Sequence, residues 1–351
     1  MIEELLRESF ARHEAQAPAT ETLRRGIDAL ATRRRHRRTA VLTGGVAATV
    51  AVLLVAVTVI VRQLAPVVGN LPTVPLPGHV PDRALNILLL GLDTRPEFPP
   101  PYRSDIVSVV HVSEDRNHVY LVDIPRDLLV DIPGHGEDKL SSAHAFGGPQ
   151  LSATVVENLT GLELDGTVTV DLGALRELAD ILGPVPVCLP FSMSVSTDGR
   201  TFEPGCYTLD SDDVVDIARE RYNVPMGAIS RAANVQRILV GFAEQAASLD
   251  LLGDADQLAA LLAIDGITID LPDIDPVALA AQLRGVAAAD IVGIADPFHG
   301  AADRIVLLPS GASVMLLDQQ VAPQLFSALH DETLADFVAA HPDWVSTSVL
   351  G

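Results

Sequence analysis

Residues 122–134 read VDIPRDLLVDIPG, and in this stretch a predicted β-strand ends in a charged pair. The strand HVYLVDIP, residues 118–125, runs directly into Arg126 and Asp127. It follows the predicted strand DIVSVVHVS, residues 105–113, across the polar turn EDRN, which indicates a β-hairpin. Cations are scarce in this chain, which has 46 acidic and 24 basic residues. An arginine at a strand end, where α/β sheets usually build their sites, is therefore a candidate functional residue.

Predicted strands and helices alternate on both sides of this hairpin. Strands are expected at 86–93, 166–171 and 184–190, and helices at 149–161, 172–183, 211–222 and 231–249. This alternation predicts the α/β class, with a single domain over residues 85–330 in which helices flank a mixed sheet. Residues 331–351 are predicted to form a C-terminal tail.

The first 84 residues predict a membrane anchor. Residues 1–38 hold nine arginines and six acids, a basic tail, and residues 39–61 carry no charge over 23 positions. That length suffices to cross a bilayer as an N-terminal transmembrane helix, and the basic run Arg33–Arg38 places the N-terminus in the cytoplasm. A cleaved signal peptide is the competing interpretation, but its short basic region and small-residue cleavage site are absent. Residues 62–84 contain five prolines and predict an extended linker to an extracellular domain.

The two cysteines favour a disulfide. Cys188 and Cys206 are separated by 17 residues, and outside the cytoplasm a bond between them would stabilise the fold by roughly 3 kcal/mol. Two unpaired thiols are the alternative.

The residues that best indicate a function are the few basic side chains of residues 39–351, a region that is acidic as a whole. Residues 39–351 hold 15 basic and 40 acidic residues, a balance that argues against nucleic-acid binding. Seven of the 15 gather in three short windows, and Lys139 is the only lysine: Arg95 and Arg103, Arg126 and Lys139, and Arg219, Arg221 and Arg231. Arginine forks and a lysine point charge suit phosphate, and Asp93 and Asp105 could hold Mg²⁺ against phosphate oxygens. Ordinary surface ion pairs are the commoner explanation for any one neighbouring pair.

Three segments carry a resemblance to a known family. GLDTRPEFPPPYRSD, IPRDLLVDIPGHGEDKLSSAHAFGGP and ARERY together resemble the LytR–CpsA–Psr (LCP) family of bacterial cell-wall proteins, over residues 85–328. The resemblance implies a sheet flanked by helices, with an apolar groove for a lipid chain. It also implies a phosphotransferase that attaches a glycopolymer, carried on polyprenyl pyrophosphate, to peptidoglycan through a phosphodiester. The membrane would then hold both the enzyme and its lipid donor.

The resemblance also assigns roles to individual residues. Asp93 and Asp105 match the magnesium-linked acids, and Asp127 matches the carboxylate of the IPRD motif. Arg126, Asp127 and Asp105 are the expected catalytic residues. The expected pyrophosphate-binding set is Arg95, Arg103, Arg126, Lys139, Arg219, Arg221, Arg231 and Gln236.

One block departs from the family pattern. The family has D-x-G-R-x-x-R-Q-Q where this chain reads AISRAANVQ, so Ala228, Asn234 and Val235 replace an acid, an arginine and a glutamine. The alternative function is therefore an impaired family member that binds polyprenyl lipid or a cell-wall partner without turnover. A third hypothesis, a membrane-tethered structural or regulatory protein, predicts dispersed arginines and no apolar tunnel. The oligomeric state stays open.

Overall fold

The computed structural model describes residues 78–94, 100–249, 261, 264–294, 305–308 and 311–347. The predicted basic tail 1–38, the predicted span 39–61 and most of the predicted linker lie outside the described residues. Among the helices that are described, none is both long enough and apolar enough to cross a bilayer.

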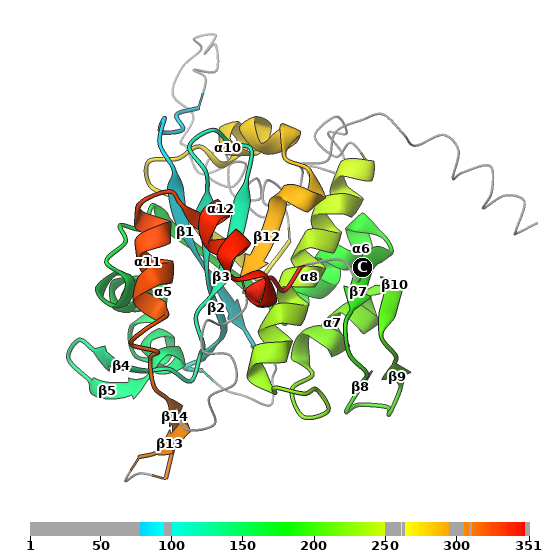
Figure 1. Ribbon diagram of the computed structural model, residues 1–351. Helices are drawn as coiled ribbons and strands as arrows, with labels where there is room; N and C mark the ends of the chain where they lie inside the picture. The colour runs from blue at the N-terminus through cyan, green and yellow to red at the C-terminus, as the bar shows by residue number, and fades with distance from the viewer. Residues whose placement is uncertain are drawn as a thin grey trace, which may run out of the picture. The chain divides into compact units, whose positions relative to one another are not determined.

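A six-stranded mixed sheet forms the centre of the domain (Figure 1). In spatial order the strands are β11 (Ile267–Asp270), β6 (Gly166–Asp171), β1 (Leu85–Leu92), β2 (Ser104–Val112), β3 (Val119–Asp123) and β12 (Ile291–Ile294). Antiparallel pairs join β1 to β2, β2 to β3 and β11 to β6, while β1 with β6 and β3 with β12 are parallel. This confirms the predicted mixed sheet and the predicted hairpin.

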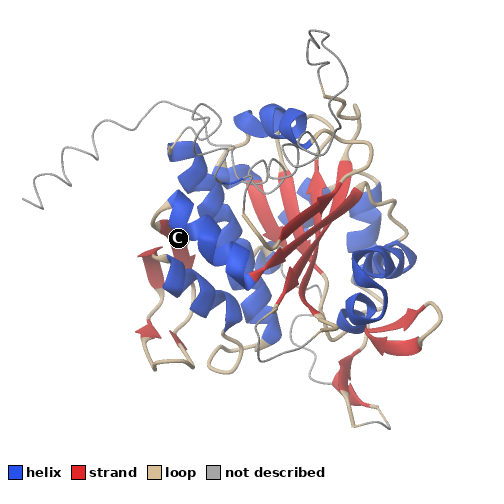
Figure 2. Cartoon of the chain, turned by 180° about the vertical axis from the view of Figure 1, so that it is seen from behind, coloured by secondary structure: helices blue, strands red, loops and turns tan. Residues whose placement is uncertain are grey.

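Helices cover both faces of this sheet (Figure 2). In β1, Ile87 and Leu89 belong to the core on one face, while Leu88 and Leu90 belong to the core on the other. A strand buried on both faces reads as a continuous apolar run, which is the pattern LNILLLGL of β1. The helices are α5 (Leu140–Thr160), α6 (Leu172–Leu182), α7 (Ser211–Arg219), α8 (Ala228–Ser248), α10 (Pro276–Gln282), α11 (Ala322–His330) and α12 (Leu334–Ala340).

Local chemistry explains where the helices begin and end. The Asp171 carboxylate accepts from the Ala174 amide at 2.8 Å to start α6, and Asp210 accepts from the Asp213 amide at 2.9 Å to start α7. Helix α5 is kinked at Gly147–Gly148, and Gly161, with φ of 74°, ends it in the left-handed region. The helix predicted at 172–183 is confirmed as α6, and the helix predicted at 149–161 is the part of α5 that follows the kink, whereas the part of α5 before the kink, from Leu140, was not predicted.

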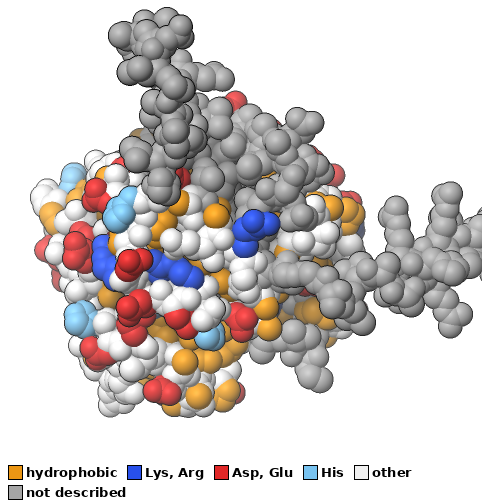
Figure 3. Space-filling model, turned by 90° about the horizontal axis from the view of Figure 1, so that it is seen from above, with side chains coloured by type: hydrophobic (Ala, Val, Ile, Leu, Met, Phe, Trp, Pro, Cys, Tyr) orange, Lys and Arg blue, Asp and Glu red, His pale blue; other side chains and the backbone are white. Residues whose placement is uncertain are grey.

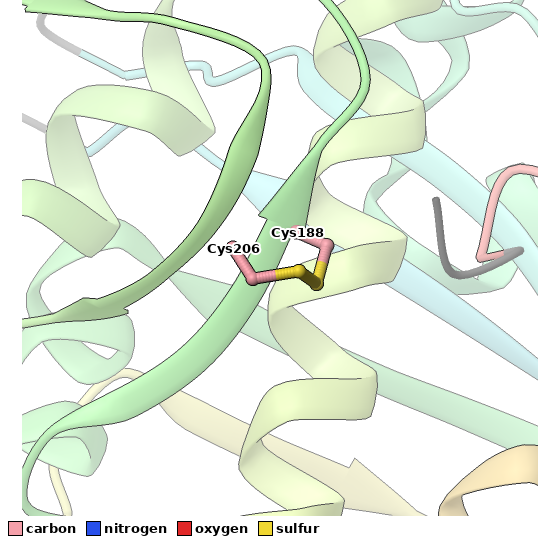
Figure 4. Close-up of a disulfide and its surroundings, with 2 residues drawn as sticks. All are labelled: Cys188 and Cys206. Atoms are coloured by element: carbon pink, nitrogen blue, oxygen red, sulfur yellow. A yellow bond between two sulfur atoms is a disulfide. The ribbon is translucent and has the colours of Figure 1, made fainter. Parts of the chain in front are cut away.

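In the part of the chain that the structure describes, four short two-stranded pairs lie outside the central sheet. They are β4 (Leu129–Ile132) with β5 (Gly136–Lys139), β7 (Val185–Leu189) with β10 (Gly205–Leu209), β8 (Met193–Ser194) with β9 (Thr201–Phe202), and β13 (Ile305–Leu307) with β14 (Ser313–Met315). The predicted strand at 184–190 is thus present as β7, in a two-stranded sheet of its own. Cys188 of β7 lies opposite Cys206 of β10, and the two form the predicted disulfide (Figure 4).

The last residues of the predicted linker are tied to the domain by Arg116. This guanidinium donates to the carbonyls of Pro81 at 2.5 Å and Arg83 at 2.9 Å, and to the Gln282 side chain at 3.1 Å. Arg83 in turn pairs with Asp165 at 2.5 Å. Figure 3 looks onto the end of the domain that carries α10, where basic and acidic side chains lie side by side.

Residues 331–347, predicted as a tail, contribute to the core. Leu334 and Phe337 of α12 are buried in the same cluster as Leu325 of α11. Farther along, the Ser346 amide donates to the Gly293 carbonyl at 2.8 Å beside the edge strand β12.

Substitution of Gly241 tests the contact between α8 and β7. A Cβ at Gly241 would lie 2.3 Å from the Pro186 carbonyl oxygen and 2.9 Å from Val185 Cγ1. Alanine normally favours a helix over glycine by about 1 kcal/mol, but this clash should reverse the sign and destabilise the domain by about 1–3 kcal/mol. Guanidinium unfolding followed by the fluorescence of Trp344, the only tryptophan, measures it.

Gly285→Ala is the matched control, because a Cβ there meets nothing within 4 Å. If Gly241→Ala proved as stable as Gly285→Ala, the close packing of α8 on β7 would be contradicted.

Candidate functional site

A cavity of about 680 Å³ lies between the sheet and helices α6, α7 and α8. It adjoins the C-terminal end of β1 and the N-terminal end of β2, where the chain leaves the sheet. Its walls combine two chemistries. The apolar part includes Leu89, Leu92, Ile106, Val170, Leu172, Leu175, Val195, Val235 and Leu239, and the charged part includes Arg103, Arg126, Arg219, Arg221 and Arg231.

Arg126 reaches the cavity from the end of β3. The strand stops at Asp123, and a turn follows in which the Leu128 amide donates to the Pro125 carbonyl at 3.0 Å. The guanidinium forms an ion pair with Asp105 and lies 3.9 Å from Asp127. Its Nε is one of the buried nitrogens that have no hydrogen-bond partner among the described residues.

Arg231 approaches the same carboxylate from the first turn of α8. Its Nη2 donates to the Asp105 carbonyl at 2.7 Å, and its Nη1 lies 3.5 Å from the Asp105 carboxylate. Only 5% of the side chain is exposed, and its Nε, too, is buried without a partner in the described part of the chain. Asp105 thus holds two arginines from different elements at one wall of the cavity.

Crowding of the arginines changes their proton affinity. The pKa of Arg126 is lowered to about 10, mainly by burial, while the nearby charge of Asp127 opposes this decrease and the charges of Arg231, Arg221 and Arg103 add to it. Burial and Arg221 likewise lower the pKa of Arg231. Several cations held close together and away from water form a site that an anion would stabilise, and such perturbed groups concentrate at functional sites.

The carboxylates of the cavity wall differ in what they contact. Asp171 caps α6 and accepts from the Thr94 hydroxyl at 2.8 Å, and Asp216 pairs with Arg200 at 2.6 Å. Asp93 and Asp105, the two predicted magnesium-linked acids, both line the cavity beside the arginines. Two carboxylates on one wall fit the way in which Mg²⁺ is held with phosphate oxygens. Among the described residues, no group of three or more His, Cys, Asp or Glu side chains could hold a metal alone.

The cavity does not receive every predicted site residue. Lys139 ends β5 and pairs with Asp127 at 2.7 Å, so this pair lies beside Arg126 and outside the cavity lining. The Gln236 amide donates to the carbonyls of Leu121 at 2.7 Å and Ile294 at 3.1 Å, which joins α8 to the sheet away from the cavity. Arg95 lies outside the described residues.

The block that departs from the family pattern divides between core and cavity. Asn234 is fully buried, and its side-chain oxygen accepts from Arg237 at 3.0 Å. It does not line the cavity, whereas the neighbouring Val235 adds an aliphatic surface to it. Ala228 is the first residue of α8. Where the family has an arginine, this chain therefore has Asn234, whose side chain makes a hydrogen bond within α8.

Two carboxylates near the arginines were not predicted. Asp123 is buried at the end of β3 and faces the charge of Arg231, and Glu220 is buried between Arg219 and Arg221 in the chain. Asp123 ends an otherwise apolar strand, VYLVD. A charged residue in a buried strand is unusual, and this could have marked Asp123 as a candidate site residue. Glu220 gave no comparable signal, because one acid among many looks like a surface residue.

The buried Asp123 predicts a pH-dependent stability. Burial raises its pKa to about 7, with Arg231 opposing the rise. The unfolded chain releases this proton near the ordinary value of 3.8, so the stabilising contribution is complete below about pH 4 and is lost as the pH rises through 7. Asp123→Asn should therefore be more stable than wild type above pH 7, by at most about 4 kcal/mol, with the difference vanishing towards pH 4.

Guanidinium unfolding between pH 4 and 8 measures this difference, with the exposed Asp131→Asn as the control. A constant gap between Asp123→Asn and wild type across that range would contradict the assignment.

This chain is similar in sequence to a known protein family. The LytR_cpsA_psr family profile matches residues 72–327. A TagU polyisoprenyl-teichoic acid–peptidoglycan teichoic acid transferase of Enterococcus faecalis is 31% identical over 188 residues, which is 53% of this chain and 61% of that protein. The TagU of Bacillus cereus is 32% identical over 179 residues, 50% and 58% of the two chains. The matches therefore span about three fifths of each relative's length.

Solved structures share the fold at lower sequence identity. TagV of B. subtilis has a TM-score of 0.60 and 20% identity, covering 72% of this chain and 98% of its own. TagT bound to LIIa-WTA has a TM-score of 0.56 and 23% identity, covering 73% and 93%. The profile match extends over more than half of the sequence and includes the strands, the helices and the arginines that form the cavity. The chain belongs to the LytR_cpsA_psr family.

Proposed function

We propose that this protein is a phosphotransferase that moves a glycopolymer from polyprenyl pyrophosphate onto peptidoglycan through a phosphodiester. The observation that carries the proposal is a single cavity whose wall combines five arginines with a large apolar surface. A donor with a diphosphate joined to a long hydrocarbon has the same two chemistries. The related TagU proteins are teichoic acid transferases that act on peptidoglycan, which supports transfer of a glycopolymer.

In the proposed reaction, the acceptor hydroxyl oxygen forms a bond to the phosphorus that carries the glycan. The bond from that phosphorus to polyprenyl phosphate breaks, and polyprenyl phosphate leaves with the electron pair. Arg126 and Arg231, oriented by Asp105, would stabilise the negative charge on the phosphate oxygens in the transition state. Asp127 lies 3.9 Å from the Arg126 guanidinium and is the carboxylate proposed to accept the hydroxyl proton, while Asp105 orients the arginines.

The remaining predicted residues have subsidiary roles in this proposal. Arg103, Arg219 and Arg221 would bind the second phosphate, and Lys139 would hold Asp127 in place through their 2.7 Å ion pair. Asp93 and Asp105 would hold Mg²⁺, which when bound neutralises charge on the phosphate oxygens. The proposed location is the outer face of the cell membrane, with residues 39–61 as the single span, because the donor lipid is confined to a bilayer.

A second candidate, binding without turnover, is favoured by the altered α8 block. Val235 presents an aliphatic surface to the cavity, and the Asn234 side chain, outside the cavity lining, accepts a hydrogen bond from Arg237. The third hypothesis predicted dispersed arginines and no apolar tunnel, and the gathering of arginines at an apolar cavity argues against it.

Replacing Arg126 tests the proposed chemistry. Full-length protein in detergent, with Mg²⁺, a polyprenyl-pyrophosphate-linked glycan and peptidoglycan fragments, should release polyprenyl phosphate. Arg126→Ala should slow this release by about 10²–10³-fold, because a charge-stabilising group is lost. Arg126→Lys should retain part of the rate, since a lysine keeps the charge and loses the planar fork. Chromatography of the released lipid measures both.

Arg176→Ala is the matched control, because Arg176 is an exposed arginine that pairs with Asp212 away from the cavity. Release that is equally fast in wild type and Arg126→Ala would contradict the proposed role. Donor binding with no release in wild type would favour the second candidate.

A further inference from the structure

A buried carboxylate separates two of the cavity arginines. Glu220 follows the last residue of α7, lies between Arg219 and Arg221 in the chain, and is only 4% exposed. A glutamate next to two arginines would be expected to pair with them. Yet among the ion pairs of the described residues, none joins Glu220 to an arginine.

The carboxylate instead accepts hydrogen bonds from two separate segments. Oε2 accepts from the Ser196 amide at 2.8 Å and from the Ser196 hydroxyl at 2.6 Å. Oε1 accepts from the amides of Tyr222 at 2.8 Å and Asn223 at 3.1 Å. Each oxygen thus receives two donors, one pair from the segment after β8 and one pair from the turn after α7.

Asn223 adds a parallel connection between the same two segments. Its side-chain amide donates to the Ser194 carbonyl at 3.1 Å and to the Ser196 hydroxyl at 3.2 Å. Ser196 and Arg221 both line the cavity. The turn that carries Arg221 is therefore fixed to the Ser194–Ser196 segment by Glu220 and Asn223 together.

Hydrogen bonding also keeps Glu220 ionised. Burial alone would raise its pKa, but the bonds from Ser196, Asn223 and Tyr222 outweigh burial and hold the pKa below its ordinary value. Because the lone pairs of the Glu220 carboxylate are directed to these internal donors, Glu220 does not pair with the Arg221 guanidinium, which stays available to bind an anion. That guanidinium lies near enough to Arg126 and Arg231 to lower the pKa of each.

We propose that Glu220 is a positioning residue that fixes the Arg221 turn against the cavity and thereby sets the affinity of the site for a diphosphate. The inference rests on the proposed function, in which Arg221 binds the pyrophosphate of the donor. Tyr222 also contacts Arg221, because the Arg221 guanidinium donates to the Tyr222 hydroxyl at 2.7 Å and lies 4.9 Å from the centre of the Tyr222 ring.

Glu220→Gln is the sharpest variant, because it keeps the shape and removes one acceptor oxygen. The single amide oxygen can satisfy either the Ser196 pair or the Tyr222 and Asn223 pair, and the NH₂ group then faces two donors. We expect the full-length protein in detergent to bind inorganic pyrophosphate about tenfold more weakly, measured by calorimetry below the unfolding temperature. Glu203→Gln is the matched control, since Glu203 is exposed and its carboxylate accepts from the Ser192 hydroxyl at 2.6 Å in the same part of the fold.

A double-mutant cycle distinguishes positioning from a general structural effect. If Glu220 acts through Arg221, then Glu220→Gln should weaken binding no further in an Arg221→Ala background. A general loss of structure would weaken binding by the same factor in both backgrounds. Asn223→Ala provides a milder break of the same connection, with an expected loss of about threefold that also vanishes without Arg221, should Glu220→Gln fold poorly.

Two results would overturn the inference alone: wild-type affinity in both Glu220→Gln and Asn223→Ala, or equal losses with and without Arg221. Wild-type protein that binds no pyrophosphate would overturn the proposed function, and the inference with it.

Discussion

The site is organised by one carboxylate, that of Asp105, which contacts Arg126 from the end of β3 and Arg231 from the start of α8. Both guanidiniums are largely buried, and a buried charge is tolerated only when it is paired. Asp105 of β2 therefore brings together a charge from the neighbouring strand β3 and a charge from α8, which lies 126 residues farther along the chain. Because one carboxylate faces two arginines, the pairing leaves positive charge at the cavity, which suits a phosphate ligand.

The protein as a whole is acidic, in contrast to the arginines that gather at the cavity. The chain has a formal net charge of −22, and acids also line the cavity. Three of them, Asp171, Asp216 and Glu220, bind a helix terminus, Arg200 and backbone amides respectively, and among the described ion pairs none of the three joins a cavity arginine. The attraction for anions therefore acts at short range inside the cavity, while the acidic surface repels polyanions at long range.

Much of the fold could be predicted because its signals are local. The apolar run of β1, the polar turn before β3, the Asp171 cap and the terminal Gly161 each act within a few residues. Arg126 could be singled out for the same reason, as a scarce cation directly after a strand. Gln236 could not be placed, since its partners, the carbonyls of Leu121 and Ile294, come from β3 and β12, far away in the chain.

The sequence by itself determined the α/β class, the order of the main strands and helices up to residue 249 and the family resemblance, and it favoured the disulfide between Cys188 and Cys206 over two unpaired thiols. Only the tertiary structure decided which charges meet: that Asp105 binds Arg126 and Arg231, that Lys139 binds Asp127, and that Glu220 is buried. The physical reason is that secondary structure follows from short-range preferences of the backbone. The partner of a charged side chain depends instead on how whole elements pack, which no local pattern records.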